Sequence, residues 1–82
     1  MPTIKRIGRF RVVVYPNDHR PAHVHIIGSD SEAVFDLNCP VGPPELRENY
    51  GFSLKALGKI KSELDEDLAF FCSEWSRIHG HP

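Results

Sequence analysis

The sequence predicts an α+β fold in which an antiparallel meander of three to four strands is followed by a long C-terminal amphipathic helix. Three observations predict it. Apolar and polar residues alternate in several short segments of the first half, as in strands that are buried on one face only. Clusters of Pro, Gly, Asn and Asp separate these segments. From residue 54 onward, apolar residues recur every three or four positions, which is the spacing of one helix face.

The first strand is predicted at Arg9–Tyr15, where Phe10, Val12 and Val14 share one face. A turn is expected at Pro16-Asn17-Asp18, because Pro restricts its own backbone while Asn and Asp accept turn geometry. The chain should therefore reverse direction at this point and pair with itself in the antiparallel sense.

The second strand is predicted to follow this turn and to end at the Gly and Ser residues of positions 28–31. Successive side chains of a strand point to opposite faces. Val24 and Ile26 should therefore lie on one face, and His23 and His25 should lie side by side on the other.

A third strand is predicted at Glu32–Leu37, where every second residue is apolar. Residues 38–44 contain three prolines, which neither a central strand nor a helix interior accepts, so this segment is predicted to be a connector. Two interpretations stay open for residues 45–52. They form either a short fourth strand or an irregular crossover.

The C-terminal helix is predicted to begin after Ser53, a good N-cap residue, and to stop at Gly80. Its apolar stripe, which includes Trp75 as a core residue, should cover the apolar face of the sheet. An unbroken helix would be about 39 Å long, whereas a domain of this size has a radius of gyration of about 12 Å. Two outcomes therefore stay open. The helix breaks, at Gly58 or at the acidic cluster of residues 63–67, or its overhanging part forms a homodimer.

Composition indicates one small globular domain over residues 1–82, with 40% hydrophobic and 26% charged residues. The first residues lack the apolar run of a signal peptide, and no segment approaches the length that spans a bilayer, so a cytoplasmic location without membrane contact is expected.

Cys39 and Cys72 are far apart in sequence and are predicted to be two reduced thiols. Although the net charge is only -1, the first twenty residues are basic.

The main concentration of chemistry is the histidine segment, Asp18-His19-Arg20-Pro21-Ala22-His23-Val24-His25. If Val24 and Ile26 face the helix, the two strand histidines must lie on the opposite face of the sheet. The same alternation places five polar side chains of the first and third strands on that face: Arg9, Arg11, Tyr15, Glu32 and Asp36.

Several interpretations of this segment stay open. His19, His23 and His25 have the residue type for acid–base cleavage of RNA, with arginine stabilising charge on phosphate. Histidines two apart on a strand also supply two metal ligands, to which His19 or Asp18 adds a third, although the sequence does not bring His79 or His81 close as a fourth. A third interpretation is nucleic-acid binding without catalysis, through five basic residues and Tyr15 as a stacking surface: Lys5, Arg6, Arg9, Arg11 and Arg20. In a fourth, histidine hydrogen bonds to backbone carbonyls only stabilise the turn.

The chain resembles a family of bacterial proteins, the domain of unknown function 4160 family. The resemblance rests on the opening Met-Pro-Thr-Ile, on the pattern Asp18-His19-x-Pro21-x-His23-x-His25, and on a last helix that carries Trp75 and His79. The commoner family pattern has a second proline and an aromatic residue where this chain has Ala22 and Val24, and neither change removes a histidine. The resemblance implies a small prokaryotic protein whose relatives are often encoded beside another small protein, an arrangement proposed to form toxin–antitoxin pairs.

The leading hypothesis is a toxin–antitoxin component that binds a small cognate protein and RNA, with histidine-dependent, metal-independent ribonuclease activity at His19, His23 and His25. Arg9, Arg11, Tyr15 and Arg20 are the expected binding residues. This hypothesis assigns no cofactor and no metal ion. The alternative is a non-enzymatic module that binds a metal ion or another protein.

Overall fold

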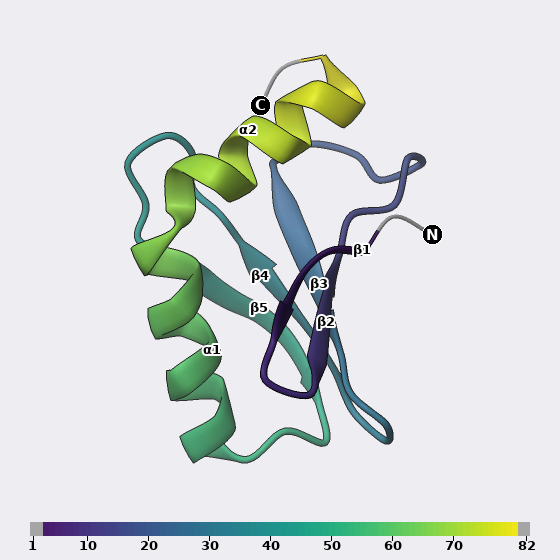
Figure 1. Cartoon of the computed structure of the whole chain (residues 1–82), viewed down its shortest axis with the longest axis vertical. Coiled ribbons are helices and arrows are strands. Elements are labelled where there is room, and N and C mark those ends of the chain that lie inside the picture. Colours follow the sequence, from purple (N-terminus) through teal and green to yellow (C-terminus); the bar gives the residue numbers. More distant parts are fainter. Residues whose placement is uncertain (1–2, 81–82) are drawn as a thin grey trace.

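A computed structural model describes residues 3–80 of the chain. Five antiparallel strands form one sheet in the order β1-β2-β3-β4-β5, and two helices follow it (Figure 1). The elements are, in chain order, β1 (Thr3–Ile7), β2 (Phe10–Val13), β3 (His23–Ile27), β4 (Glu32–Asp36), β5 (Glu45–Tyr50), α1 (Leu54–Glu66) and α2 (Leu68–His79). The predicted α+β class is confirmed. Within residues 3–80, neither helix has the length and apolar character needed to cross a bilayer.

The sheet has five strands, so the prediction of three to four was too low. The additional strand is β1, which pairs with β2 across a tight turn that contains Gly8 at a φ of 59°. Only Ile7 in β1 is buried, and the segment Thr-Ile-Lys-Arg-Ile does not alternate strictly, so it carries a weak strand signal. The open question about residues 45–52 is answered by β5, an edge strand whose six residues are all exposed.

The long C-terminal helix breaks at Asp67, within the acidic cluster, and Gly58 lies inside α1. Asp67 has a φ of -121° and a ψ of 30°, which is outside helical geometry. The predicted ends are confirmed. The Ser53 side chain accepts a hydrogen bond from the Ala56 N–H at 3.1 Å, and Gly80 closes α2 with a φ of 93°.

The hydrophobic core lies between one face of the sheet and the two helices, which together cover that face (Figure 1). The strands contribute residues from alternate positions, including Val12, Val24 and Phe35. Trp75 has no exposed surface and belongs to this core, as predicted. Both helices pack on the same side of the sheet, and only Trp75 of α2 reaches a side chain of the opposite face among the ring contacts of residues 3–80, that of His23.

Cys39 and Cys72 form a disulfide, so the prediction of two reduced thiols is wrong for this structure. The bond joins the connector after β4 to the second turn of α2, with 5.8 Å between the two Cα atoms. The break at Asp67 redirects the chain and brings Cys72 to the connector. A sequence separation of 33 residues gave no indication of this contact.

Candidate functional site

Strand pairing places both strand histidines on the face of the sheet opposite the hydrophobic core. His25 lies opposite Val13 on β2 and Val34 on β4, and His23 lies opposite Asp36. Paired residues of antiparallel strands share a face. The prediction that His23 and His25 share a face with Asp36 is therefore confirmed.

Arg11 and Glu32 lie on this same face, because both are paired with Ile27 of β3. Arg9 does not follow the prediction. It lies in the turn between β1 and β2 and takes no part in strand pairing, because β2 begins one residue later than expected. The Arg11 guanidinium bonds the Thr3 hydroxyl at 3.4 Å, toward the β1 side of the sheet.

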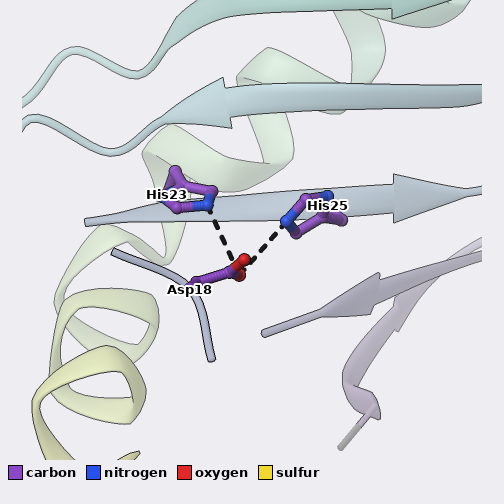
Figure 2. Close-up of side chains that lie close together, drawn as sticks. All are labelled: Asp18, His23 and His25. Atoms are coloured by element: carbon purple, nitrogen blue, oxygen red, sulfur yellow. Dashed lines mark hydrogen bonds and ion pairs between the residues drawn. The ribbon is translucent and has the colours of Figure 1, made fainter. Parts of the chain in front are cut away.

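A tight turn before β3 brings the Asp18 carboxylate to the two histidines (Figure 2). The Asp18 N–H donates to the Tyr15 carbonyl at 3.0 Å, and the Tyr15 N–H donates to Asp18 Oδ2 at 3.2 Å. These two bonds close the turn and fix the carboxylate through the backbone of its own loop. Its position therefore does not depend on a flexible side chain from another element.

Asp18 Oδ2 lies 3.1 Å from His25 Nε2 and 3.4 Å from His23 Nε2. One potential ligand atom from each residue lies within 4.8 Å of the other two. The exposed fractions of the side chains are 16% for Asp18, 6% for His23 and 15% for His25. The three side chains are therefore largely buried, and the two Nε2 atoms converge on the Asp18 carboxylate.

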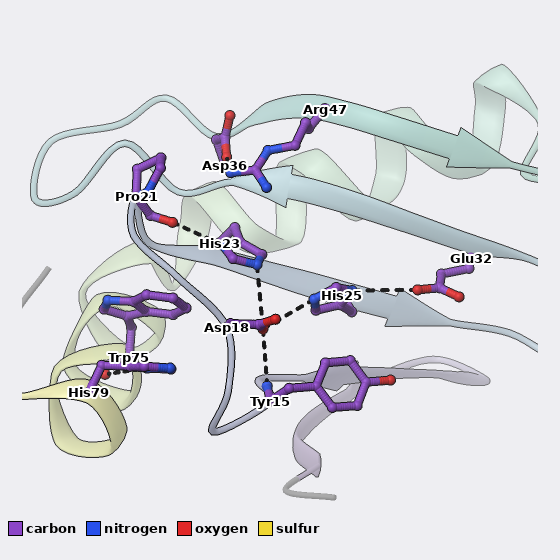
Figure 3. Close-up of polar contacts among 10 residues, drawn as sticks. All are labelled: Tyr15, Asp18, Pro21, His23, His25, Glu32, Asp36, Arg47, Trp75 and His79. Atoms are coloured by element: carbon purple, nitrogen blue, oxygen red, sulfur yellow. Dashed lines mark hydrogen bonds and ion pairs between the residues drawn. The ribbon is translucent and has the colours of Figure 1, made fainter.

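The other nitrogen of each imidazole also faces an oxygen atom (Figure 3). His23 Nδ1 donates to the Pro21 carbonyl at 2.9 Å, which requires a hydrogen on Nδ1 because a carbonyl only accepts. His25 Nδ1 lies 3.4 Å from Glu32 Oε2, at ion-pair distance but outside hydrogen-bond geometry. In its neutral form, His23 therefore presents the Nε2 lone pair to Asp18.

Two acceptors that face each other across 3.4 Å repel unless a cation lies between them. His25 lies between two carboxylates, and a neutral imidazole has one N–H, so it satisfies only one of them as a donor. Either a proton on each ring or a metal ion at the point of convergence removes this mismatch.

Aromatic packing fixes the orientation of both imidazole rings. The His23 ring lies 5.2 Å from the Trp75 indole, and the His25 ring lies 4.7 Å from the Tyr15 phenol, edge to face. The two imidazoles are themselves 5.2 Å apart. On α2, the His79 ring stacks on the Trp75 indole with 3.8 Å between the ring centroids, so Trp75 contacts both His23 and His79. The ligand atoms are therefore held in place before anything binds.

The cluster lies at an open pocket of about 510 Å³. The turn contributes His19 and Arg20 to its wall, and β5 contributes Arg47 and Glu48. His19 lines this pocket, but its ring is not part of the converging set. Three ligand atoms beside an open space leave room for solvent or a small ligand at the same point.

The comparison with protein families matches residues 9–76 to the Domain of unknown function (DUF4160). The chain belongs to this family. The match includes the whole histidine segment and both helices up to Trp75 and Ser76, but not β1. No curated protein and no solved structure matches the chain.

The sequence-predicted residues of this DUF4160 domain are only partly brought together. His23, His25 and Tyr15 are in contact, and His19 and Arg20 line the adjoining pocket. Lys5 lies elsewhere, in an ion pair with Asp67 at the helix break. His81, which was considered as a further ligand, lies outside the described residues.

Arg47 and Glu48 are pocket residues that the sequence did not predict. The pairing of β4 with β5 shifts register between Val34 and Phe35, whose partners are Glu48 and Leu46. Arg47 is thus the extra residue of a β-bulge. Bulges leave little signal in a polar edge strand, because no apolar alternation exists there for them to interrupt.

Proposed function

We propose that this DUF4160 domain binds a divalent first-row transition-metal ion through Asp18, His23 and His25. The observation that carries the proposal is the orientation of the imidazoles, whose Nε2 atoms converge on one carboxylate oxygen while their Nδ1 atoms face other oxygens. Metal-binding histidines characteristically donate their second N–H to a carbonyl or carboxylate, which fixes the ring and its tautomer. The Pro21 carbonyl is this acceptor for His23, and the Glu32 carboxylate lies 3.4 Å from His25 Nδ1, at ion-pair distance without a hydrogen bond.

Two imidazoles and one carboxylate suit ions such as Zn²⁺, Fe²⁺ and Co²⁺. Three protein ligands leave at least one coordination position for water or a ligand, and the site adjoins an open pocket. This arrangement is typical of working metal sites, whereas purely structural zinc sites usually have four protein ligands.

The geometry supports a metal site better than metal-independent RNA cleavage. Acid–base cleavage needs one group beside the attacking hydroxyl and another beside the leaving oxygen, hence two groups on opposite sides of the phosphate. His23 and His25 instead direct Nε2 toward the same Asp18 oxygen.

The toxin–antitoxin role, with a small cognate protein and RNA as partners, stays a prediction. Induced expression of the protein with and without the neighbouring gene tests this role. Unimpaired growth in both cases would contradict toxin activity.

Calorimetric titration of tag-free, chelator-treated protein with Zn²⁺ tests the metal proposal, and Co²⁺ serves as a spectroscopic probe. We expect one ion per chain. Asp18→Asn keeps the acceptor for the Tyr15 N–H but removes the charge, and His25→Ala removes a ligand. Each should weaken binding by at least the roughly 10- to 100-fold typical of lost second-sphere partners.

His19→Ala is the matched control, because His19 lines the pocket without joining the converging set. It should leave Zn²⁺ affinity within about twofold of the unmodified chain. Circular dichroism of each variant shows whether it is folded. Absence of one-to-one binding in the folded chain would refute the proposal, as would an equal loss of affinity in His19→Ala and His25→Ala.

A further inference from the structure

Arg47 reaches the histidine pocket because of the bulge in β5. In a regular strand, residues 47 and 48 would point to opposite faces of the sheet. Both nevertheless line this pocket, and the register shift between Val34 and Phe35 accounts for it. Bulges that redirect a side chain are common beside active sites. The bulge places a guanidinium on the same side of the sheet as the two imidazoles.

The position of Arg47 is fixed by an ion pair with Asp36, the residue that lies opposite His23. The bond involves Nη2 of Arg47, and about a third of its side chain, 34%, stays exposed. A guanidinium carries five N–H donors in one plane. Among residues 3–80, Asp36 is the polar partner of Arg47, and the remaining N–H donors of the guanidinium are available to a ligand in the pocket.

A bound metal ion would make the pocket more positive and give an anion a direct partner there. The charged residues on its wall, apart from the histidines, are Asp18, Arg20, Arg47 and Glu48, and their formal charges cancel. Two carboxylates lie just behind this wall, Asp36 beside Arg47 and Glu32 beside His25. A divalent ion would add two positive charges and so offset them. The Glu48 carboxylate accepts a hydrogen bond from the Tyr50 hydroxyl at 2.7 Å, which holds it toward Tyr50 on the same strand.

Given the proposed metal site, on which this inference rests, we propose that the pocket binds a phosphate group, with one oxygen on the metal ion and others on Arg47. Phosphate suits this pair of groups because its oxygens point in several directions, so that a metal ion and a guanidinium can bind it together. The phosphate is either that of a small phosphate ester or that of a nucleic-acid backbone, which share this chemistry.

Calorimetry of stoichiometrically Zn²⁺-loaded protein, with inorganic phosphate as the probe and metal content measured beforehand, tests this inference. Arg47→Gln should weaken phosphate binding about tenfold or more, because a charge-assisted hydrogen-bond pair is lost, while the Zn²⁺ content stays at one per chain. Arg77→Gln is the matched control. Arg77 is an exposed arginine that pairs with Glu74 on α2 and does not line the pocket, so phosphate affinity should change by less than twofold.

Three results would overturn the inference: loaded protein that does not bind phosphate, Arg47→Gln that binds it as tightly as the unmodified chain, or acetate that binds equally well. Failure of the metal proposal is seen separately, as absence of Zn²⁺ before any phosphate is added. A short single-stranded RNA, followed by fluorescence anisotropy, distinguishes the two sources. Arg47-dependent RNA binding that phosphate displaces identifies the backbone, whereas phosphate binding without RNA binding identifies a small ester.

Discussion

Breaking the bond between Cys39 and Cys72 should lower the free energy of unfolding by about 3.7 kcal/mol. The disulfide joins residues separated by 33 positions, and the loop-entropy relation for a loop of that length gives about 12.5 cal/mol/K. A small domain has a total stability of about 5–15 kcal/mol, so this loss is a large fraction of it. The bond ties α2, which carries Trp75, to the connector after β4.

Urea unfolding followed by fluorescence of the single, fully buried Trp75 provides the assay. The oxidised protein is compared with protein kept in reductant and with the double variant Cys39→Ala/Cys72→Ala. With a urea m-value of about 1–3 kcal/mol/M, the midpoint should fall by about 1–4 M in the reduced protein. The midpoint of the double variant should fall by a similar amount, and any cavity left by the missing sulfur atoms would lower it further. Two reactive thiols in the folded, unreduced protein would refute the reasoning, as would superimposable curves with and without reductant.

Four further outcomes are expected. Ser53→Ala should lower the free energy of unfolding by about 1 kcal/mol, measured by urea unfolding, because it removes the N-cap bond of α1. Gly42→Ala should cost about 1–3 kcal/mol in the same assay, since Gly42 has a φ of +73° and an added Cβ would lie 2.8 Å from Leu68. The pKa of the Tyr50 phenol is raised by its hydrogen bond to Glu48 and by the charge of that carboxylate, so Glu48→Gln should lower it, as followed by ultraviolet absorbance in alkaline titration. Zn²⁺ at 100 times its dissociation constant should stabilise the folded chain by about 2.7 kcal/mol in thermal unfolding, and removal by a chelator should reverse the gain.

The parts of the fold that the sequence predicted are those with an apolar face. β3 and β4 alternate apolar and polar residues because one face packs on the helices, and the helix stripe follows from the same burial. β1 and β5 are edge strands with few buried residues, so their positions depend on backbone pairing that no side-chain pattern records. The disulfide was not predicted for a similar reason, because it joins two segments that lie far apart in the sequence.

The candidate site was predictable to a similar extent. The period of a strand placed His23 and His25 side by side, and the neighbouring turn made Asp18 one of two candidates for a third ligand. The choice of Asp18 over His19 depends on how the turn closes on Tyr15, which is a matter of backbone geometry. Arg47 enters through an irregularity in strand pairing, and residue types alone do not reveal it.

The three converging groups come from one short stretch of chain, since Asp18 and His25 are only seven positions apart. Closing so small a loop costs little entropy compared with joining distant segments. The set can therefore assemble as soon as the turn and the start of β3 form, before the later strands and helices are in place. A metal ion present at that moment would favour native turn geometry over competing arrangements. Holding the connection between β2 and β3 together during folding would then be an additional consequence of the site.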